Sequence, residues 1–284
     1  MSSVLVNGRL VPEAEATVSV FDRGFLFADG IYEVAAVVDG RLVDLDAHLA
    51  RLERSAREIA LALPMPRAEL AATLADLTAR NGVTEGMVYV QVTRGAPPVR
   101  DFAFPAAGTA PTLVAFTQAF PVLASTKGTS GVAVVTVPEV RWKRRDIKSV
   151  ALLGQVLARQ AAVTAGAAEA FFVDEDGTVT EGAASNAYVV MAGTLVTRPL
   201  GNDILHGTTR ARVLEVARAQ GVPVVERRFT REELLSADEA FYTGAAAFVV
   251  PAVRIDGKAI GAGTPGPITR ALREGYIASV RSGL

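Results

Sequence analysis

The chain has 284 residues, of which 50% are hydrophobic, and its formal net charge is −1. That length suffices for one large domain or two modest ones that each bury a core. The absence of cysteine excludes disulfides, thiolate nucleophiles and cysteine-based metal sites, and the dispersed basic residues predict no nucleic-acid partner. His48 and His206 are too few for a histidine-built metal centre, and no Gly-x-Ser-x-Gly elbow supports a serine triad.

Neither a secretory signal nor a membrane span is predicted. Residues 1–9 contain no apolar h-region. The longest weakly charged stretch, 149–168, is interrupted by Gln155, Arg159 and Gln160, as expected of a helix inside a protein. We therefore expect a cytoplasmic protein without a membrane partner.

Residues 1–118 are predicted to form an α+β domain. Hairpins and strands are expected at 4–11, 31–43, 87–93 and 112–116, and a helix at 67–80. Another helix follows Asp44 or Asp46, either of which is a suitable cap. Its buried stripe has helical spacing and consists of Leu45, Leu49, Leu52, Ala56 and Ile59, while the adjacent flank carries His48, Arg51 and Ser55.

Residues 119–124 are predicted to connect this domain to a second one at 125–284. Strands are expected there at 131–137, 170–173, 186–191, 223–226, 239–243 and 249–255. Helices are expected after Lys148, from Gly207 to about Ala219, and after Pro265. Because strands and helices alternate without a regular βαβ period, both halves are predicted to be α+β with antiparallel or mixed sheets.

Lys148 is the first candidate for chemistry. It lies where the charged stretch 141–148 gives way to the apolar residues 150–153. Lost solvation and neighbouring cations both favour the neutral amine, which is the form that attacks carbonyl groups and forms Schiff bases. The alternative is a surface lysine at the start of a helix.

Three further features are compatible with one phosphorylated ligand. Glu181 is the only carboxylate among small residues in 180–186, and a buried carboxylate needs a cationic partner such as a protonated pyridine nitrogen. Thr208 and Thr209 open a helix, where free amides favour an anion such as phosphate, and Arg51 could reach a phosphate from its helix flank. The alternatives are a solvated glutamate, ordinary helix capping and a solvated arginine.

The order of these pieces resembles the fold-type IV pyridoxal-phosphate aminotransferases, and within them the branch that acts on D-amino acids. The resemblance covers nearly the whole chain and is carried by residues 21–34, 48–52, 91–95, 141–142, 146–149, 180–186 and 207–210. It implies an α+β fold of two domains, like that of the D-amino acid and branched-chain aminotransferases, and a homodimer. The expected activity is ping-pong transfer of an amino group from a D-amino acid, such as D-alanine, to a 2-oxo acid.

The resemblance also implies roles for individual residues. Lys148, placed in the second domain, would form the Schiff base with pyridoxal 5′-phosphate and move the substrate proton. Glu181 would pair with the pyridine nitrogen, and Arg51, Thr208 and Thr209 would hold the phosphate.

On the substrate side, the resemblance assigns Tyr32 to the lining and Arg100 to the α-carboxylate. The branch that acts on D-amino acids carries Arg-x-His at this loop, whereas this chain has Arg100-Asp101-Phe102. Phenylalanine cannot donate a hydrogen bond to a carboxylate. This loop leaves open a branched-chain L-amino acid or R-amine transaminase of the same fold. Two further alternatives are an aminodeoxychorismate lyase, which shares the fold and the lysine, and a non-catalytic cofactor-binding or interaction protein.

Overall fold

The computed structural model describes residues 2–283, which divide into two compact units. The first unit contains residues 2–122 together with 147–151, and the second contains 123–146 and 152–283. The boundary after residue 122 falls within the predicted connector. Among residues 2–283, no helix is long and apolar enough to cross a membrane.

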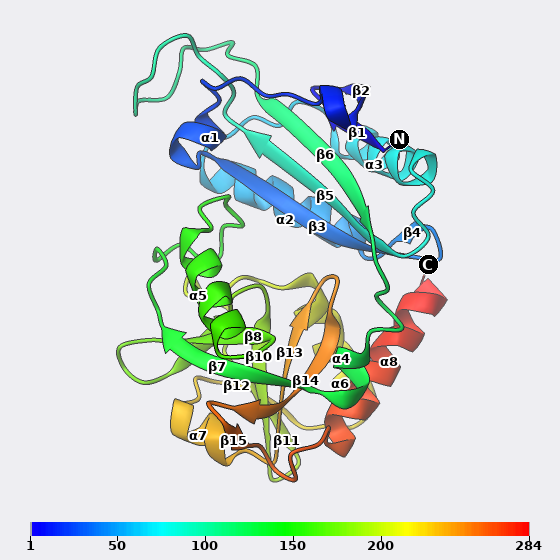
Figure 1. The fold of residues 1–284 in the computed structure, drawn as a ribbon, viewed down its shortest axis with the longest axis vertical. Helices are drawn as coiled ribbons and strands as arrows, with labels where there is room; N and C mark the ends of the chain where they lie inside the picture. The colour runs from blue at the N-terminus through cyan, green and yellow to red at the C-terminus, as the bar shows by residue number, and fades with distance from the viewer. Residues whose placement is uncertain (1, 284) are drawn as a thin grey trace. The chain divides into compact units, whose positions relative to one another are not determined.

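The described residues of the first unit form one six-stranded antiparallel sheet in the order β2-β1-β6-β5-β3-β4 (Figure 1). Its strands are β1 (Ser3–Val6), β2 (Arg9–Pro12), β3 (Gly30–Val38), β4 (Arg41–Leu42), β5 (Gly86–Thr93) and β6 (Thr112–Ala119). A short 3-10 helix, η1 (Glu13–Glu15), and a one-turn helix, α1 (Arg23–Phe27), precede β3.

Helices α2 (Leu45–Glu58) and α3 (Arg67–Arg80) complete the first unit and bury one face of its sheet. The predicted stripe of α2 enters the core through Leu49, Leu52 and Ala56, each at most 3% exposed. Asp44 occupies the N-cap position of α2, but its side chain makes no capping hydrogen bond.

The segment 147–151 corrects the predicted domain assignment, which placed Lys148 in the second domain. The carbonyl of Lys148 accepts a hydrogen bond of 3.0 Å from the backbone N–H of Tyr32, and Ile147 packs into the core of the first unit. Strand β4 pairs only with residues 37 and 38, at the C-terminal end of β3. The segment 147–151 supplies hydrogen-bond partners for backbone groups at the N-terminal end of the same edge of β3.

The second unit has a mixed sheet of nine strands among the residues described, in the order β12-β11-β10-β13-β14-β7-β8-β9, with β15 paired to β14. The strands are β7 (Val132–Pro138), β8 (Glu169–Val173), β9 (Val179–Gly182), β10 (Asn186–Met191), β11 (Thr194–Thr197), β12 (Val224–Glu226), β13 (Glu239–Gly244), β14 (Phe248–Ile255) and β15 (Lys258–Ala259). Three neighbouring pairs are parallel, namely β11 with β12, β14 with β7, and β7 with β8. The predicted α+β class with antiparallel and mixed sheets is confirmed.

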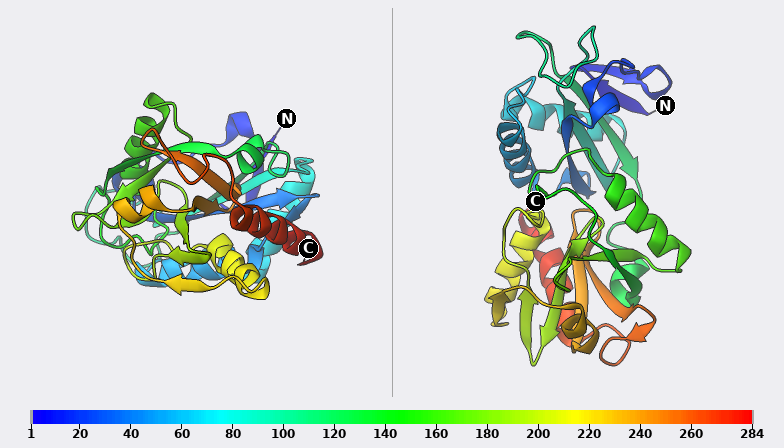
Figure 2. Two further views of the ribbon diagram at one scale, coloured as in Figure 1. Left: turned by 90° about the horizontal axis from the view of Figure 1, so that it is seen from below. Right: turned by 90° about the vertical axis from the view of Figure 1, so that its left-hand side faces the viewer.

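Helices cover both faces of this sheet, and successive residues of a strand point to opposite faces. The helices are α4 (Thr126–Ser130), α5 (Leu153–Thr164), α6 (Thr208–Ala219), α7 (Arg231–Ser236) and α8 (Pro267–Gly283). In β8, Ala170 and Phe172 face the alanines of α5, while Phe171 faces a core that includes Leu234 of α7. The second view of Figure 2 shows α5, in green, projecting from the side of this unit.

Candidate active site

The predicted site residues fall in both units. Lys148 lies in the first, in the segment that leads to α5. Its backbone N–H donates a hydrogen bond of 3.3 Å to Oγ of Ser55 on α2. Its Nζ lies 4.2 Å from the centre of the Tyr32 ring. Lys148 is therefore half-buried against β3 and α2 and is not a fully solvated lysine at the start of a helix.

Arg51 belongs to a buried cluster that couples α2 to β3. Its Nε and Nη2 donate to the two carboxylate oxygens of Glu33 at 2.7 and 2.8 Å, and Nδ1 of His48 lies 2.7 Å from Glu33 Oε2. Burial alone would raise the pKa of Glu33, but the charge and hydrogen bonds of Arg51, together with His48, lower it to about 2. Glu33 thus fixes the orientation of the Arg51 guanidinium.

Tyr32 begins a file of aromatic rings across β3, β5 and β6. Its ring stacks on Tyr89, with 5.5 Å between centroids, and Tyr89 stacks on Phe116 at 4.8 Å. Burial, followed by the proximity of Tyr32, raises the pKa of Tyr89, whose hydroxyl donates to Gln91 at 2.7 Å. The surface beside Lys148 is therefore aromatic, with hydrogen-bonding groups at its edge.

Arg100 lies on the loop that joins β5 to β6 and is exposed. Its guanidinium carbon is 4.7 Å from the centre of the Phe27 ring and 5.3 Å from that of Phe102. Phe102 itself is 76% exposed and packs against Phe27 with tilted rings, whose centroids are 5.1 Å apart. The side chain that stands in place of the histidine thus contacts the ring of Phe27 on α1 and the guanidinium of Arg100.

In the second unit, Glu181 lies on β9 and is 4% exposed. Nη1 of Arg141 donates to its Oε1 at 2.6 Å, and Nη2 of Arg141 donates to Glu139 at 2.7 Å. Burial raises the pKa of Glu181, and Arg141, whose charge is shared with Glu139, only partly offsets that effect. Glu181 is a buried carboxylate, so the alternative of a solvated glutamate is wrong.

Asn186 connects Glu181 to the start of α6. Its Nδ2 donates to Oε2 of Glu181 at 3.1 Å and to the carbonyl of Leu205 at 3.0 Å, while the N–H of Leu205 donates to the same carboxylate oxygen at 2.9 Å. The helix then begins at Thr208, with Gly207 at its N-cap and no capping bond from a side chain. These bonds hold Glu181 beside the segment that leads into α6, where Thr209 is buried.

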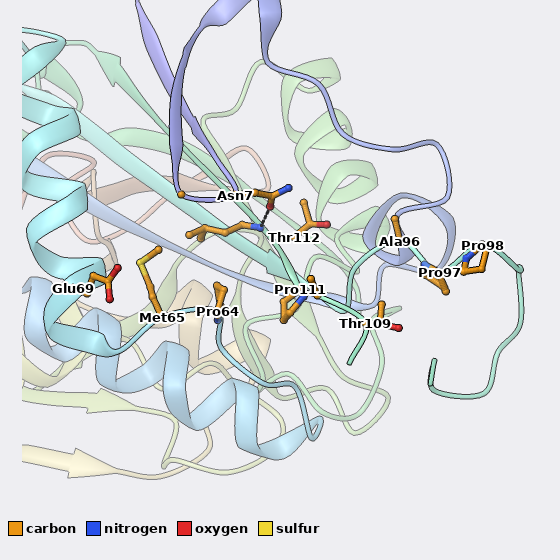
Figure 3. A pocket seen from close by; sticks show the side chains of 13 residues that line it. Asn7, Pro64, Met65, Glu69, Ala96, Pro97, Pro98, Thr109, Pro111 and Thr112 are labelled. Carbon is orange, nitrogen blue, oxygen red and sulfur yellow. Dashed lines mark hydrogen bonds between the residues drawn. The ribbon is translucent and has the colours of Figure 1, made fainter. Parts of the chain in front are cut away.

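A cavity of about 750 Å³ lies elsewhere in the first unit (Figure 3). It is bounded by the two ends of the loop that carries Arg100 and by the segment before α3, and its lining includes Asn7, Met65, Glu69 and Pro111. Oδ1 of Asn7 accepts a hydrogen bond from the N–H of Leu113 at 2.9 Å. None of the predicted site residues lines this cavity.

Glu33, Arg141 and Asn186 were not predicted as site residues. All three lie in stretches that carry the family resemblance, which is the only signal that could have pointed to them. Their roles depend on contacts between residues far apart in the sequence, such as the 40 positions between Arg141 and Glu181.

The sequence profile of amino-transferase class IV matches residues 30–255. The chain belongs to this family. Its relatives include a D-alanine aminotransferase from Bacillus licheniformis, which is 42% identical over 98% of this chain and 97% of that protein. The predicted fold-type IV family is thereby confirmed, and the chain is an aminotransferase.

Solved structures of the family agree with the fold. A branched-chain aminotransferase from Thermoproteus uzoniensis, solved with norvaline, has a TM-score of 0.85 and 30% identity, covering 99% of this chain and 95% of that one. A hypothetical aminotransferase from Mycobacterium tuberculosis, solved in a PLP-bound form, has a TM-score of 0.85 at 24% identity and covers both chains completely.

Proposed function

We propose that this class IV aminotransferase uses pyridoxal 5′-phosphate to move the amino group of a D-amino acid, such as D-alanine, to a 2-oxo acid in a ping-pong cycle. The observation that carries the proposal is the 42% identity to a D-alanine aminotransferase over nearly the full length of both proteins. A cytoplasmic location, expected from the sequence, is part of the proposal.

The residues of the second unit fit the ring and phosphate of this cofactor. Three donors occupy the carboxylate of Glu181, which leaves room for another among its roughly four acceptor positions. A protonated ring nitrogen would fill that position and add the cation that this buried carboxylate favours. Thr208 and Thr209 would hold the phosphate at the start of α6, where backbone N–H groups have no partner within the helix.

The first unit supplies the remaining attachments. Arg51, oriented by Glu33, would add a positive charge for the phosphate. When bound, the cofactor supplies an aldehyde that bonds to amines and a ring that accepts the electrons released at the substrate α-carbon. Lys148 would provide the amine for attachment and then, freed and neutral, would take the α-proton on Nζ and deliver it again on the cofactor side.

Tyr32 and Arg100 are proposed to orient the substrate. The ring of Tyr32 lies beside Nζ of Lys148 and would line the reacting side. Arg100 would take the α-carboxylate with its planar fork, and the direction of that carboxylate decides which α-hydrogen faces Lys148. Because Phe102 offers no second donor, Arg100 would bear most of this recognition.

The enzyme is further proposed to act as a homodimer. On α5, Leu153, Val156 and Leu157 are 71%, 59% and 59% exposed, and Trp142 of the same unit is 43% exposed. These residues leave one helix face apolar and uncovered, which is the character of a surface that pairs with another chain.

A half-reaction screen tests the substrate assignment. The holoenzyme is mixed with D-alanine, D-glutamate, L-leucine, L-glutamate or R-1-phenylethylamine, and the visible band of the bound cofactor is followed. We expect this band to decay rapidly with the D-amino acids. In Lys148→Ala, which lacks the amine that moves the proton, the rate of decay should fall at least about 1000-fold.

Other outcomes point to the remaining alternatives. Decay with L-leucine and none with D-amino acids would assign the enzyme to the branched-chain group, and decay confined to R-1-phenylethylamine would make it an amine transaminase. A cofactor band that responds to no amine would favour a lyase or a non-catalytic cofactor-binding protein, and a lyase would release pyruvate without an amino acceptor.

A further inference from the structure

Arg23, at the start of α1, is a buried arginine without a role in the proposed reaction. It is 4% exposed, and its guanidinium donates to three successive carbonyls of the loop between β5 and β6. Nη1 donates to Asp101 at 2.5 Å and to Ala103 at 3.1 Å, and Nη2 donates to Phe102 at 3.1 Å. These bonds fix the backbone that follows Arg100 directly.

Asp29 ties Arg23 to a second buried arginine, Arg94. It accepts from Nε of Arg23 at 2.7 Å and from Nε and Nη2 of Arg94 at 2.9 and 3.0 Å. Arg94 also donates to the carbonyls of Ile59 and Ala60 after α2, at 2.7 and 2.8 Å. Burial would raise the pKa of Asp29, but the two arginines lower it. The anchor of the loop is therefore an ionised network joined to the core of the first unit.

The side chains of the loop rest on the same helix. Phe27 of α1 contacts the guanidinium groups of both Arg100 and Arg23, whose carbon atoms lie 4.7 and 4.9 Å from the centre of its ring. Its ring also packs, tilted, against that of Phe102. Although Arg100 and Phe102 are exposed, the backbone from Asp101 to Ala103 accepts its hydrogen bonds from the guanidinium of a buried arginine.

We propose that Arg23 is the positioning residue for Arg100 and so determines how tightly the enzyme binds the carboxylate of its amino donor and of its 2-oxo acid acceptor. This inference rests on the proposed role of Arg100. A planar guanidinium can bond three carbonyls and a carboxylate at once, whereas a lysine ammonium has three donors on one compact centre and no fork. Arg23→Lys therefore keeps the charge and loses the geometry that fixes the loop.

Two measurements on the holoenzyme test this role. The first is the split between KM and kcat for the amino donor identified by the screen, expected to be D-alanine, and for pyruvate. The second is the rate of trypsin cleavage after Arg100, read by mass spectrometry, which requires no turnover. In Arg23→Lys, both KM values and the cleavage rate should rise about ten-fold while kcat changes less than about two-fold.

The matched control is Arg273→Lys, which alters a buried arginine that donates to the carbonyls of Val249 and Leu123 in the other unit. It should leave KM and the cleavage after Arg100 unchanged. If Arg23→Lys does not fold, as judged by circular dichroism, Asp29→Asn takes its place and should change both readouts in the same direction.

The outcomes separate the inference from the proposed function. If Arg100→Ala raises KM but Arg23→Lys changes neither KM nor cleavage, the positioning role is wrong and the proposed function stands. If Arg100→Ala leaves KM unchanged, Arg100 does not read the carboxylate and the inference is overturned together with that assignment. Equal losses of kcat in Arg23→Lys and in the control would also overturn it.

Discussion

The pKa values of two buried carboxylates, Glu33 and Glu181, are shifted in opposite directions because their arginines are shared differently. Arg51 donates two hydrogen bonds to the carboxylate of Glu33, and the pKa of Glu33 falls to about 2. Arg141 divides its bonds between Glu181 and Glu139, and the pKa of Glu181 is raised. Glu33 is thus a permanent anion that orients Arg51, whereas Glu181 gains from a further cation.

The low pKa of Glu33 predicts a stability that depends on pH. Because the pKa is depressed from 4.5 to about 2, the folded state is favoured by about 3 kcal/mol above pH 5, and this contribution is lost as the pH falls from about 4.5 toward 2. Glu33→Gln should therefore lower the free energy of urea unfolding by about 3 kcal/mol at pH 7 and by less at pH 3.5.

The control for that experiment is Asp46→Asn on the same helix, since the carboxylate of Asp46 is 93% exposed and pairs only with Arg67 among its described ion pairs. It should change the unfolding free energy by less than about 0.5 kcal/mol. A gap between wild type and Glu33→Gln that stays constant from pH 7 to pH 3.5 would contradict the assignment of the stabilisation to an ionised Glu33.

At the scale of elements, the N-terminus of α6 depends on a glycine at its cap. Gly207 has φ −64°, which any residue adopts, but a Cβ at this position would overlap Oδ1 of Asn186. Gly207→Ala should therefore displace Asn186 from Glu181 without preventing folding, and weaken the binding of pyridoxal 5′-phosphate at least about ten-fold. Titration of the apoenzyme with the cofactor measures this, with circular dichroism as the check on folding.

Gly283→Ala is a suitable comparison because its Cβ would meet only Arg212, at an ordinary 3.8 Å. Its affinity for the cofactor should equal that of the wild type. If Gly207→Ala binds the cofactor as tightly as Gly283→Ala does, the connection from Glu181 through Asn186 to α6 does not support cofactor binding.

The long elements could be predicted from the sequence, whereas several of the short ones could not. Helix α3 occupies the predicted residues 67–80 because apolar residues recur over four turns of helix. Helices α1, α4 and α7 have only five or six residues, too few to show a period, and were missed. Strand β11, also missed, has four residues and only a turn between it and β10.

The site could be predicted in part, for a related reason. Lys148 and Glu181 stand out locally, as a cation beside apolar sequence and as one acid among small residues. The bond between Arg51 and Glu33 depends on how α2 packs against β3. The three bonds of Arg23 to the loop carbonyls depend on the path of a loop about 80 residues away. No local pattern contains that information.

For the whole molecule, the apolar face of α5 is the surface on which the proposed homodimer depends. Leu153→Lys combined with Leu157→Lys places two charges where an apolar surface would be buried, so the dissociation constant of the dimer should rise at least about 100-fold. Sedimentation equilibrium measures this. Leu200→Lys, at a loop position that is 51% exposed, should leave the dimer intact, and a dimer that survives both leucine changes on α5 would contradict this surface.

The placement of residues 147–151 in the first unit means that the chain enters that unit twice. Ile147 packs into the core of the first unit, and residues 147–151 hydrogen-bond to the backbone of β3 at its N-terminal end. A chimera of two relatives joined once, inside the connector, would therefore combine the β3 of one parent with the Lys148 of the other. The two units are not interchangeable modules, and an exchange that keeps the lysine with its own sheet needs three joints.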